Sequence, residues 1–231
     1  SMRSMGLAKG DKIAILGQSS PQWAIAFMAV TTLGAVAVPI LEEFPAPDVD
    51  HILRHSEAVA VFISTLHYDN LDLPALKSMR VIFKLDDFSV LSDDAHASTR
   101  LWRHLHDLPR AIKMLDKKEE KETIEEDDLA EILYTSGTTG HSKGVMLTHK
   151  NLVSNIFEGP DLLGVIDDHS VILSILPLAH AFGSTSAFLS IIYCGAAIYY
   201  LNKPPAPKVL LHAMQTVRPT ILGAVPLVFE K

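Results

Sequence analysis

The part of this chain best equipped for chemistry is a run of ten small, polar and flexible residues, TSGTTGHSKG, at positions 135–144. It contains three glycines, one lysine at position 143, and four serines or threonines besides Thr135. Glycines let backbone N–H groups approach a ligand closely, and successive N–H groups form a concave site for an anion. The hydroxyl groups add short donors, and Lys143 adds a mobile positive charge. This donor set suits a polyphosphate. An ordinary flexible loop would need neither the enclosed lysine nor the clustered hydroxyls.

The spacing of these residues argues against one common phosphate-binding loop, the Walker A loop. In that motif the lysine is followed directly by serine or threonine. Here Lys143 lies between Ser142 and Gly144. A P-loop kinase or GTPase is therefore disfavoured.

Regular elements must position this run, and the sequence predicts strands alternating with helices. Residues 131–135 (EILYT) predict a strand that leads directly into the run. Near the N-terminus, residues 12–16 and 35–39 predict two strands joined by a helix, which Ser20 caps and Pro21 begins. That helix carries apolar residues at helical spacing and ends at a glycine: Trp23, Phe27, Val30, Leu33 and Gly34.

The same alternation continues along the chain. Strands are predicted over residues 58–63 and 79–84, and helices over residues 47–55 and 100–114. Residues 117–128 (KKEEKETIEEDD) hold seven acids and three lysines, a net charge of −4, and predict a solvated acidic connector. We expect an α/β fold with layered, mostly parallel sheets flanked by helices.

Composition narrows the classes of protein further. With 20 basic and 27 acidic residues the formal net charge is −7, which disfavours a general nucleic-acid binder. The single cysteine, Cys194, cannot form an internal disulfide, which fits a reducing compartment, and its apolar neighbours favour a buried thiol over a nucleophile. Residues 23–41 and 171–201 are uncharged over membrane-spanning lengths. For both stretches we favour a buried helix followed by a central parallel strand.

The longer segment YTSGTTGHSKGVMLTHKNL, which begins at Tyr134, resembles the phosphate-binding signature of adenylate-forming enzymes. This superfamily includes acyl-CoA synthetases, luciferases and peptide-synthetase adenylation domains. The usual motif there reads SGTTGxPKG, and Ser142 replaces its proline. Four more segments resemble parts of the same enzymes in the same order: residues 10–40, residues 126–130 (EDDLA), residues 175–183 (ILPLAHAFG) and residues 223–231 (GAVPLVFEK). The last is similar to the long-chain fatty acid–CoA ligase branch.

The resemblance implies activation of a carboxylic acid by Mg-ATP to an acyl-adenylate, followed by transfer to a thiol such as coenzyme A. The residues implied in holding the β- and γ-phosphates are Thr135, Ser136, Gly137, Thr138, Thr139, Gly140 and Lys143. Thr138 matches the position whose hydroxyl lies near Mg²⁺. The implied substrates are a fatty acid, ATP and coenzyme A. The implied location is cytoplasmic, where peripheral membrane association would suit a lipid-handling enzyme.

Several residues outside the run could be functional or structural. By the resemblance, His180 orients the acyl carboxylate and the α-phosphate, and Phe182 lines the acyl entrance. Either could instead be a core residue. Gly223, Val225 and Pro226 would form a wall of the acyl tunnel, although a buried strand would have the same pattern. His51 and His55 are four residues apart on a helix, but with no evident third metal ligand we interpret them as surface residues.

The expected organisation is partial. Residues 1–5 resemble the remnant of a tag, and residues 6–231 resemble part of an N-terminal AMP-binding domain. The adenine-site aromatic with its acidic Mg²⁺ ligand, the ribose-binding aspartate and the C-terminal lysine of these enzymes have no match. We therefore expect an incomplete fragment with little turnover alone. The alternatives are an adenylation domain for another carboxylate or a carrier protein, or a non-catalytic nucleotide-binding module.

Overall fold

The fold is taken from a computed structural model, which describes residues 2–69, 78–91, 122–135, 142–164, 166–201 and 205–224. Its strands are β1 (Lys12–Leu16), β2 (Val36–Ile40), β3 (Ala60–Ile63), β4 (Val81–Lys84), β5 (Val90–Leu91), β6 (Leu129–Thr135), β7 (Lys143–Thr148), β8 (Val171–Ser174), β9 (Ala197–Tyr200) and β10 (Ile221–Gly223). Its helices are η1 (Arg3–Met5), α1 (Pro21–Thr32), α2 (Ala46–His55), α3 (Thr65–Tyr68), α6 (His149–Leu163), α7 (Ala181–Ser184), the π-helical η3 (Thr185–Leu189), α8 (Ser190–Tyr193) and α9 (Pro207–Val217). The helix predicted over residues 100–114 and residues 117–121 of the acidic connector lie outside the described residues.

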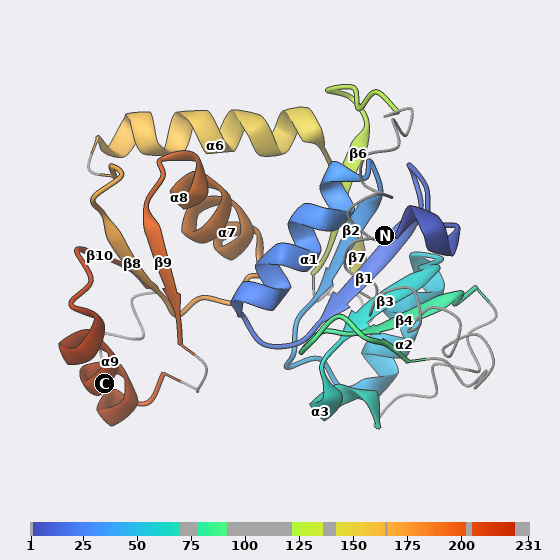
Figure 1. Cartoon of the computed structure of the whole chain (residues 1–231), viewed down its shortest axis with the longest axis horizontal. Coiled ribbons are helices and arrows are strands. Elements are labelled where there is room, and N and C mark those ends of the chain that lie inside the picture. The colour runs from blue at the N-terminus through green and yellow to red at the C-terminus, as the bar shows by residue number, and fades with distance from the viewer. Residues whose placement is uncertain are drawn as a thin grey trace, which may run out of the picture.

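The strands form two sheets, which lie side by side with α1, α7 and α8 between them (Figure 1). The larger sheet has the order β5-β4-β3-β1-β2-β6-β7, and the smaller has the order β10-β8-β9. Neighbouring strands are parallel except for the β4–β5 and β6–β7 pairs at the two edges of the larger sheet. The expected α/β fold with mostly parallel sheets is therefore confirmed.

The first strand–helix–strand unit follows directly from its sequence. The Ser20 hydroxyl accepts a hydrogen bond from the Trp23 backbone N–H at 3.1 Å, which caps α1, and Pro21 occupies the first turn. The buried face of α1 carries Trp23, Phe27 and Val30 against one face of the larger sheet. On the opposite face, α2 buries its three predicted inward residues, Val49, Ile52 and Leu53.

The two uncharged stretches form different arrangements of helix and strand. Residues 23–41 form α1 and the central strand β2, as predicted. In residues 171–201 the helical part, α7–η3–α8, leads to β9, which is an edge strand with half of its residues exposed. The prediction of a central strand there was wrong, because β8 occupies the centre of the small sheet. Among the described residues, no helix combines the length and apolarity needed to cross a membrane.

Aromatic packing and one serine join the two sheets. The Phe188 ring of η3 lies edge-on to Trp23 and Phe27 of α1, with centroid distances of 6.5 and 6.0 Å. Ser19 Oγ donates to the Leu176 carbonyl at 3.4 Å and accepts from the Leu178 N–H at 2.9 Å. The loop after β8 is thereby fixed against the loop after β1.

Candidate active site

A two-stranded hairpin holds the two ends of the glycine-rich run next to each other. β6 and β7 pair antiparallel, and their last registered pair is Thr135 with Lys143. Spacing alone did not predict β7, so sequence reasoning did not foresee that these two residues are neighbours. The other predicted phosphate-binding residues, Ser136, Gly137, Thr138, Thr139 and Gly140, lie outside the described residues.

Lys143 places a positive charge at the end of the hairpin. Both Thr135 and Lys143 are exposed at the end of the hairpin. Within the part of the chain that the structure describes, Lys143 forms no ion pair. An ammonium group at the mouth of a segment rich in glycine and hydroxyl groups is chemically suited to phosphate oxygens.

Close packing explains the glycine that follows Lys143. Gly144 is paired with Tyr134, and a Cβ atom at Gly144 would lie 3.2 Å from Tyr134 Cζ and 3.0 Å from Ile132 Cγ2. Tyr134 itself is 6% exposed. A side chain at position 144 would therefore require Ile132 and Tyr134 to shift by a few tenths of an ångström.

His180 begins the helical segment after β8 and is exposed. Its Nδ1 accepts a hydrogen bond from the Phe182 backbone N–H at 3.3 Å, so it caps α7. Because Nδ1 accepts, the neutral ring carries its proton on Nε2, which leaves a donor for a ligand. The alternative of a core histidine was wrong. Phe182 is 53% exposed, so the core interpretation of that ring was wrong as well.

A backbone contact closes the loop that presents His180. A Cβ atom on Gly183 would collide with the Pro177 carbonyl oxygen, so only glycine permits this approach. Two hydrogen bonds complete the loop, from His180 N–H to Pro177 O at 3.1 Å and from Ser184 N–H to His180 O at 2.9 Å. His180 and Phe182 are thus held on a constrained turn.

The remaining sequence predictions have mixed outcomes. Gly223 ends β10 and is half-buried, whereas Val225 and Pro226 lie outside the described residues. Cys194 is half-buried, not fully buried as expected. The described residues contain no group of three His, Cys, Asp or Glu side chains that could hold a metal ion. Of the two histidines interpreted as surface residues, His55 is exposed and His51 is half-buried.

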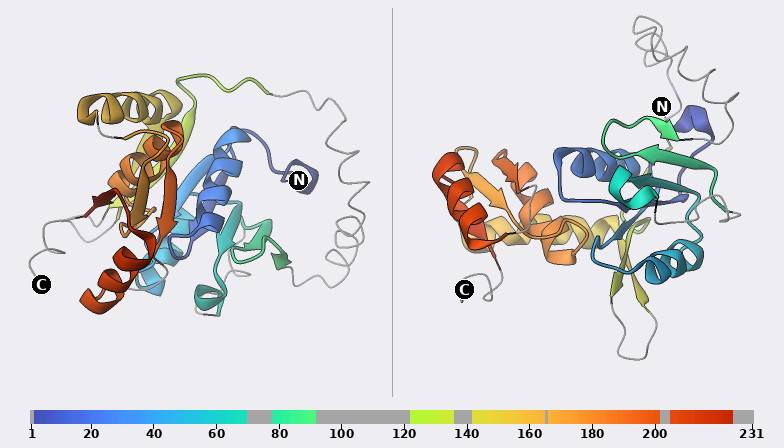
Figure 2. Two further views of the ribbon diagram at one scale, coloured as in Figure 1. Left: turned by 60° about the vertical axis from the view of Figure 1, so that its left-hand side comes forward. Right: turned by 90° about the horizontal axis from the view of Figure 1, so that it is seen from below.

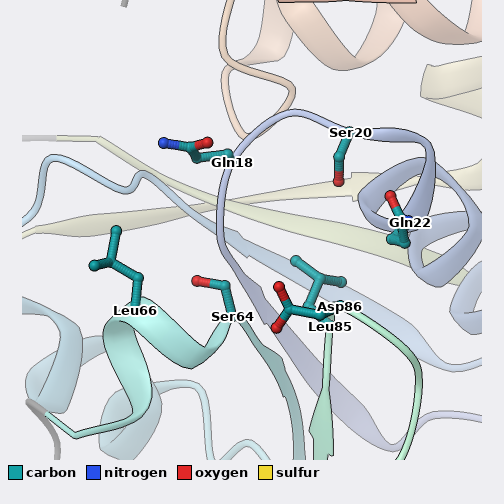
Figure 3. Close-up of a pocket in the computed structure, with 7 residues that line it drawn as sticks. All are labelled: Gln18, Ser20, Gln22, Ser64, Leu66, Leu85 and Asp86. Carbon is teal, nitrogen blue, oxygen red and sulfur yellow. The ribbon is translucent and has the colours of Figure 1, made fainter. Parts of the chain in front are cut away.

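A cavity of about 270 Å³ lies at the carboxyl ends of β1, β3 and β4 (Figure 3). β2 and β3 flank β1 on opposite sides, so β1 and β3 meet at a topological switch point, where α/β sheets commonly bind ligands. Knowledge of the strand order would have located it, but the sequence reasoning missed it. The described residues that line it include no lysine or arginine. They are Gln18, Ser20, Gln22, Ser64, Leu66, Leu85 and Asp86.

Comparisons with known proteins agree with these features. A family model described as "AMP-binding enzyme" matches residues 1–231. Long chain acyl-CoA synthetase 3 of Arabidopsis thaliana is 31% identical, covering 100% of this chain and 35% of that protein. The long-chain-fatty-acid–CoA ligase FadD15 of Mycobacterium bovis is 30% identical, covering 99% of this chain and 36% of that protein. The chain thus spans about a third of the length of these curated relatives.

Solved structures show the same fold. The structure of ATP-bound MatB from Rhodopseudomonas palustris matches 99% of this chain and 42% of that protein, with a TM-score of 0.76 and 24% identity. A structure of apo MatB from the same organism is 25% identical, with a TM-score of 0.75 and the same coverage.

Proposed function

The chain belongs to the AMP-binding family of adenylate-forming enzymes, and from this premise we propose that the whole protein is an AMP-forming fatty acid–CoA ligase. The single observation that carries the proposal is the β6–β7 hairpin, which brings Thr135 and the exposed Lys143 together at the ends of the glycine-rich run. Relatives near 30% identity that are named as long-chain acyl-CoA synthetases support the fatty acid as substrate. The similarity of residues 223–231 to the same branch adds to this support.

The proposed reaction has two steps. The fatty acid carboxylate attacks the α-phosphorus of ATP, an acyl–phosphate bond forms, and the bond to the β-phosphate breaks as pyrophosphate leaves. The thiol of coenzyme A then loses its proton and attacks the acyl carbonyl, and AMP leaves. Negative charge grows on the leaving pyrophosphate, so positioned donors near it lower the barrier of the first step.

The residues of this chain would share the work of the first step. The donors of the run, Thr135, Ser136, Gly137, Thr138, Thr139, Gly140 and Lys143, would hold the β- and γ-phosphates. Mg²⁺, when bound, neutralises phosphate charge, and the Thr138 hydroxyl is the proposed contact near it. His180 would donate from Nε2 to the acyl carboxylate or the α-phosphate. Phe182, Gly223, Val225 and Pro226 would line the path of the acyl chain.

ATP–pyrophosphate exchange tests this proposal. We would measure exchange with a panel of fatty, aromatic and amino acids, on residues 1–231 and on the whole protein. Exchange by the whole protein with fatty acids only, followed by acyl-CoA formation, would support the ligase. Pyrophosphate exchange with another class of carboxylate would show that the substrate is not a fatty acid. No exchange from the folded whole protein would overturn the proposal that it is an enzyme. We expect the isolated chain to show little exchange.

Replacing His180 tests its proposed role as a donor. We expect His180→Ala in the whole protein to slow acyl-adenylate formation about tenfold, since one hydrogen bond to the reacting groups is lost. Pyrophosphate exchange measures this rate. Alanine also removes the cap of α7, so the control is His180→Asn, because asparagine is a good capping residue. A role in binding is supported if pyrophosphate exchange is slow in both variants while His180→Asn is as stable as the parent protein. If only His180→Ala is slow, and in proportion to its lost stability, the residue is structural.

A further inference from the structure

We infer that His55 is a positioning residue for the phosphate-binding hairpin, acting through a hydrogen bond between its imidazole and the Tyr134 hydroxyl. The inference rests on the proposed function, because it assigns His55 a part in holding Lys143 where ATP would bind. His55 lies at the end of α2, 79 residues before Tyr134, and no sequence pattern connects the two.

The outer half of the hairpin has few backbone partners in the rest of the sheet. The ladder between β2 and β6 has one registered pair, Ala37 with Glu131. From Ile132 to Thr135, β6 has registered partners in β7 alone. A two-stranded ribbon is marginally stable in water. Figure 2 (right) shows β6 and β7 extending away from the body of the sheet, with α2 beside them. Ile132 and Tyr134 of β6 lie in one buried cluster with residues of both β2 and α2, so contacts to α2 help to orient the hairpin.

Tyr134 makes the polar part of that contact. Its hydroxyl lies 2.8 Å from His55 Nδ1, and the two rings meet edge-on at 87° with centroids 5.8 Å apart. Burial raises the pKa of the Tyr134 phenol, so the hydroxyl stays protonated and can donate. The tautomer of His55 sets which of the two groups donates.

Both ends of this contact are anchored. On one side, α2 is fixed to the sheet by Val49, Ile52 and Leu53, which are at most 3% exposed. On the other side, the Tyr134 ring packs on Gly144, the residue next to Lys143. The chain of contacts thus runs from a helix of the sheet, through His55 and Tyr134, to the backbone that carries the lysine. Loss of the hydrogen bond should let the hairpin and Lys143 adopt more orientations.

The test is a double-mutant cycle in the whole protein, with His55→Ala, Tyr134→Phe and the pair. We expect each single variant to raise the KM for ATP about three- to tenfold, since one hydrogen bond is lost, while the KM for the fatty acid stays the same. The double variant should be no worse than either single one, because both remove the same bond. His55→Asn should restore much of the loss, since its side-chain amide offers both an acceptor and a donor for the Tyr134 hydroxyl.

Arg54→Ala is the matched control, because Arg54 is the neighbouring residue on α2 and its exposed side chain pairs with Asp50. Hydrogen exchange of the amides in residues 143–147 should quicken in His55→Ala and Tyr134→Phe but not in Arg54→Ala. Unchanged hydrogen exchange together with an unchanged KM for ATP in His55→Ala and Tyr134→Phe would overturn the inference. Fully additive effects in the double-mutant cycle would also overturn it. Lys143→Ala distinguishes failure of this inference from failure of the proposed function. If Lys143→Ala also leaves ATP use intact, the proposed phosphate site is wrong.

Discussion

Replacing Lys143 with alanine in the whole protein is expected to lower ATP–pyrophosphate exchange by about 10²- to 10³-fold, the cost of removing a donor aimed at developing negative charge. Lys143 is exposed, ends the β6–β7 ladder opposite Thr135, and forms no ion pair with another described residue. Because the side chain is exposed, its charge can meet a phosphate, and its loss should leave the fold intact. Exchange at saturating fatty acid measures the effect, and urea unfolding checks the fold.

Lys150→Ala provides the matched control for this experiment. It removes the same charge from a residue seven positions further on, at the start of α6, where the side chain pairs weakly with the exposed Glu126. We expect exchange by this variant to stay near the parental rate. Lys143→Arg should retain part of the activity, because it keeps the charge but changes the shape of the donor. Exchange at the parental rate in Lys143→Ala would refute the phosphate role of this lysine.

The elements that follow local rules could be predicted from the sequence. The strand predicted over residues 12–16 is β1, and the helix predicted after Ser20 is α1, because a cap, a first-turn proline and apolar periodicity all agree there. β7 was missed, since residues Lys143–Thr148 show no alternation: the strand lies at a sheet edge and is partly exposed on both faces. Strand β5, two residues at the opposite edge, gave no signal either.

The sequence predicted which residues could donate hydrogen bonds to a phosphate, but not how those residues are arranged in space. The types of residue in the run indicated phosphate chemistry, and the resemblance assigned the reaction. That Thr135 faces Lys143 depends on the hairpin, and that His55 meets Tyr134 depends on α2 packing beside β6. The first pair faces across a hairpin and the second is 79 positions apart, and propensity and periodicity report neither kind of contact. The interpretation of His55 as a surface residue was right about its exposure but missed its partner.

The burial of Glu131 was also not indicated by the sequence, since a glutamate in EILYT is typical of a polar, exposed position of a strand. The structure places it at 0% exposure in β6, between β2 and β7, and neither carboxyl oxygen has a hydrogen-bond partner among the described residues. Burial without a partner disfavours the charged form and raises the pKa of Glu131 to about 8. At neutral pH the folded chain therefore holds this side chain as a neutral acid.

This raised pKa predicts how stability depends on pH. In the unfolded chain the carboxyl ionises near its ordinary pKa of 4.5, so between about pH 4.5 and 8 the folded state binds more protons than the unfolded state. The free energy of unfolding should be unaffected by Glu131 below pH 4.5, fall as the pH rises, and level off above pH 8. Each pH unit in this window costs about 1.4 kcal/mol, or about 5 kcal/mol in total.

Glu131→Gln should remove this dependence, because the carboxamide has nearly the same size and is neutral at every pH. We expect the two proteins to unfold at similar urea concentrations at pH 4.5, and the variant to be more stable by about 3 kcal/mol at pH 7. Other titrating groups are shared, so they cancel in the difference. Glu126→Gln is the control, since that side chain is 80% exposed and should shift nothing. A difference between Glu131→Gln and the parent that does not grow with pH would mean that Glu131 is ionised in the folded chain, with its charge met by a partner or by water.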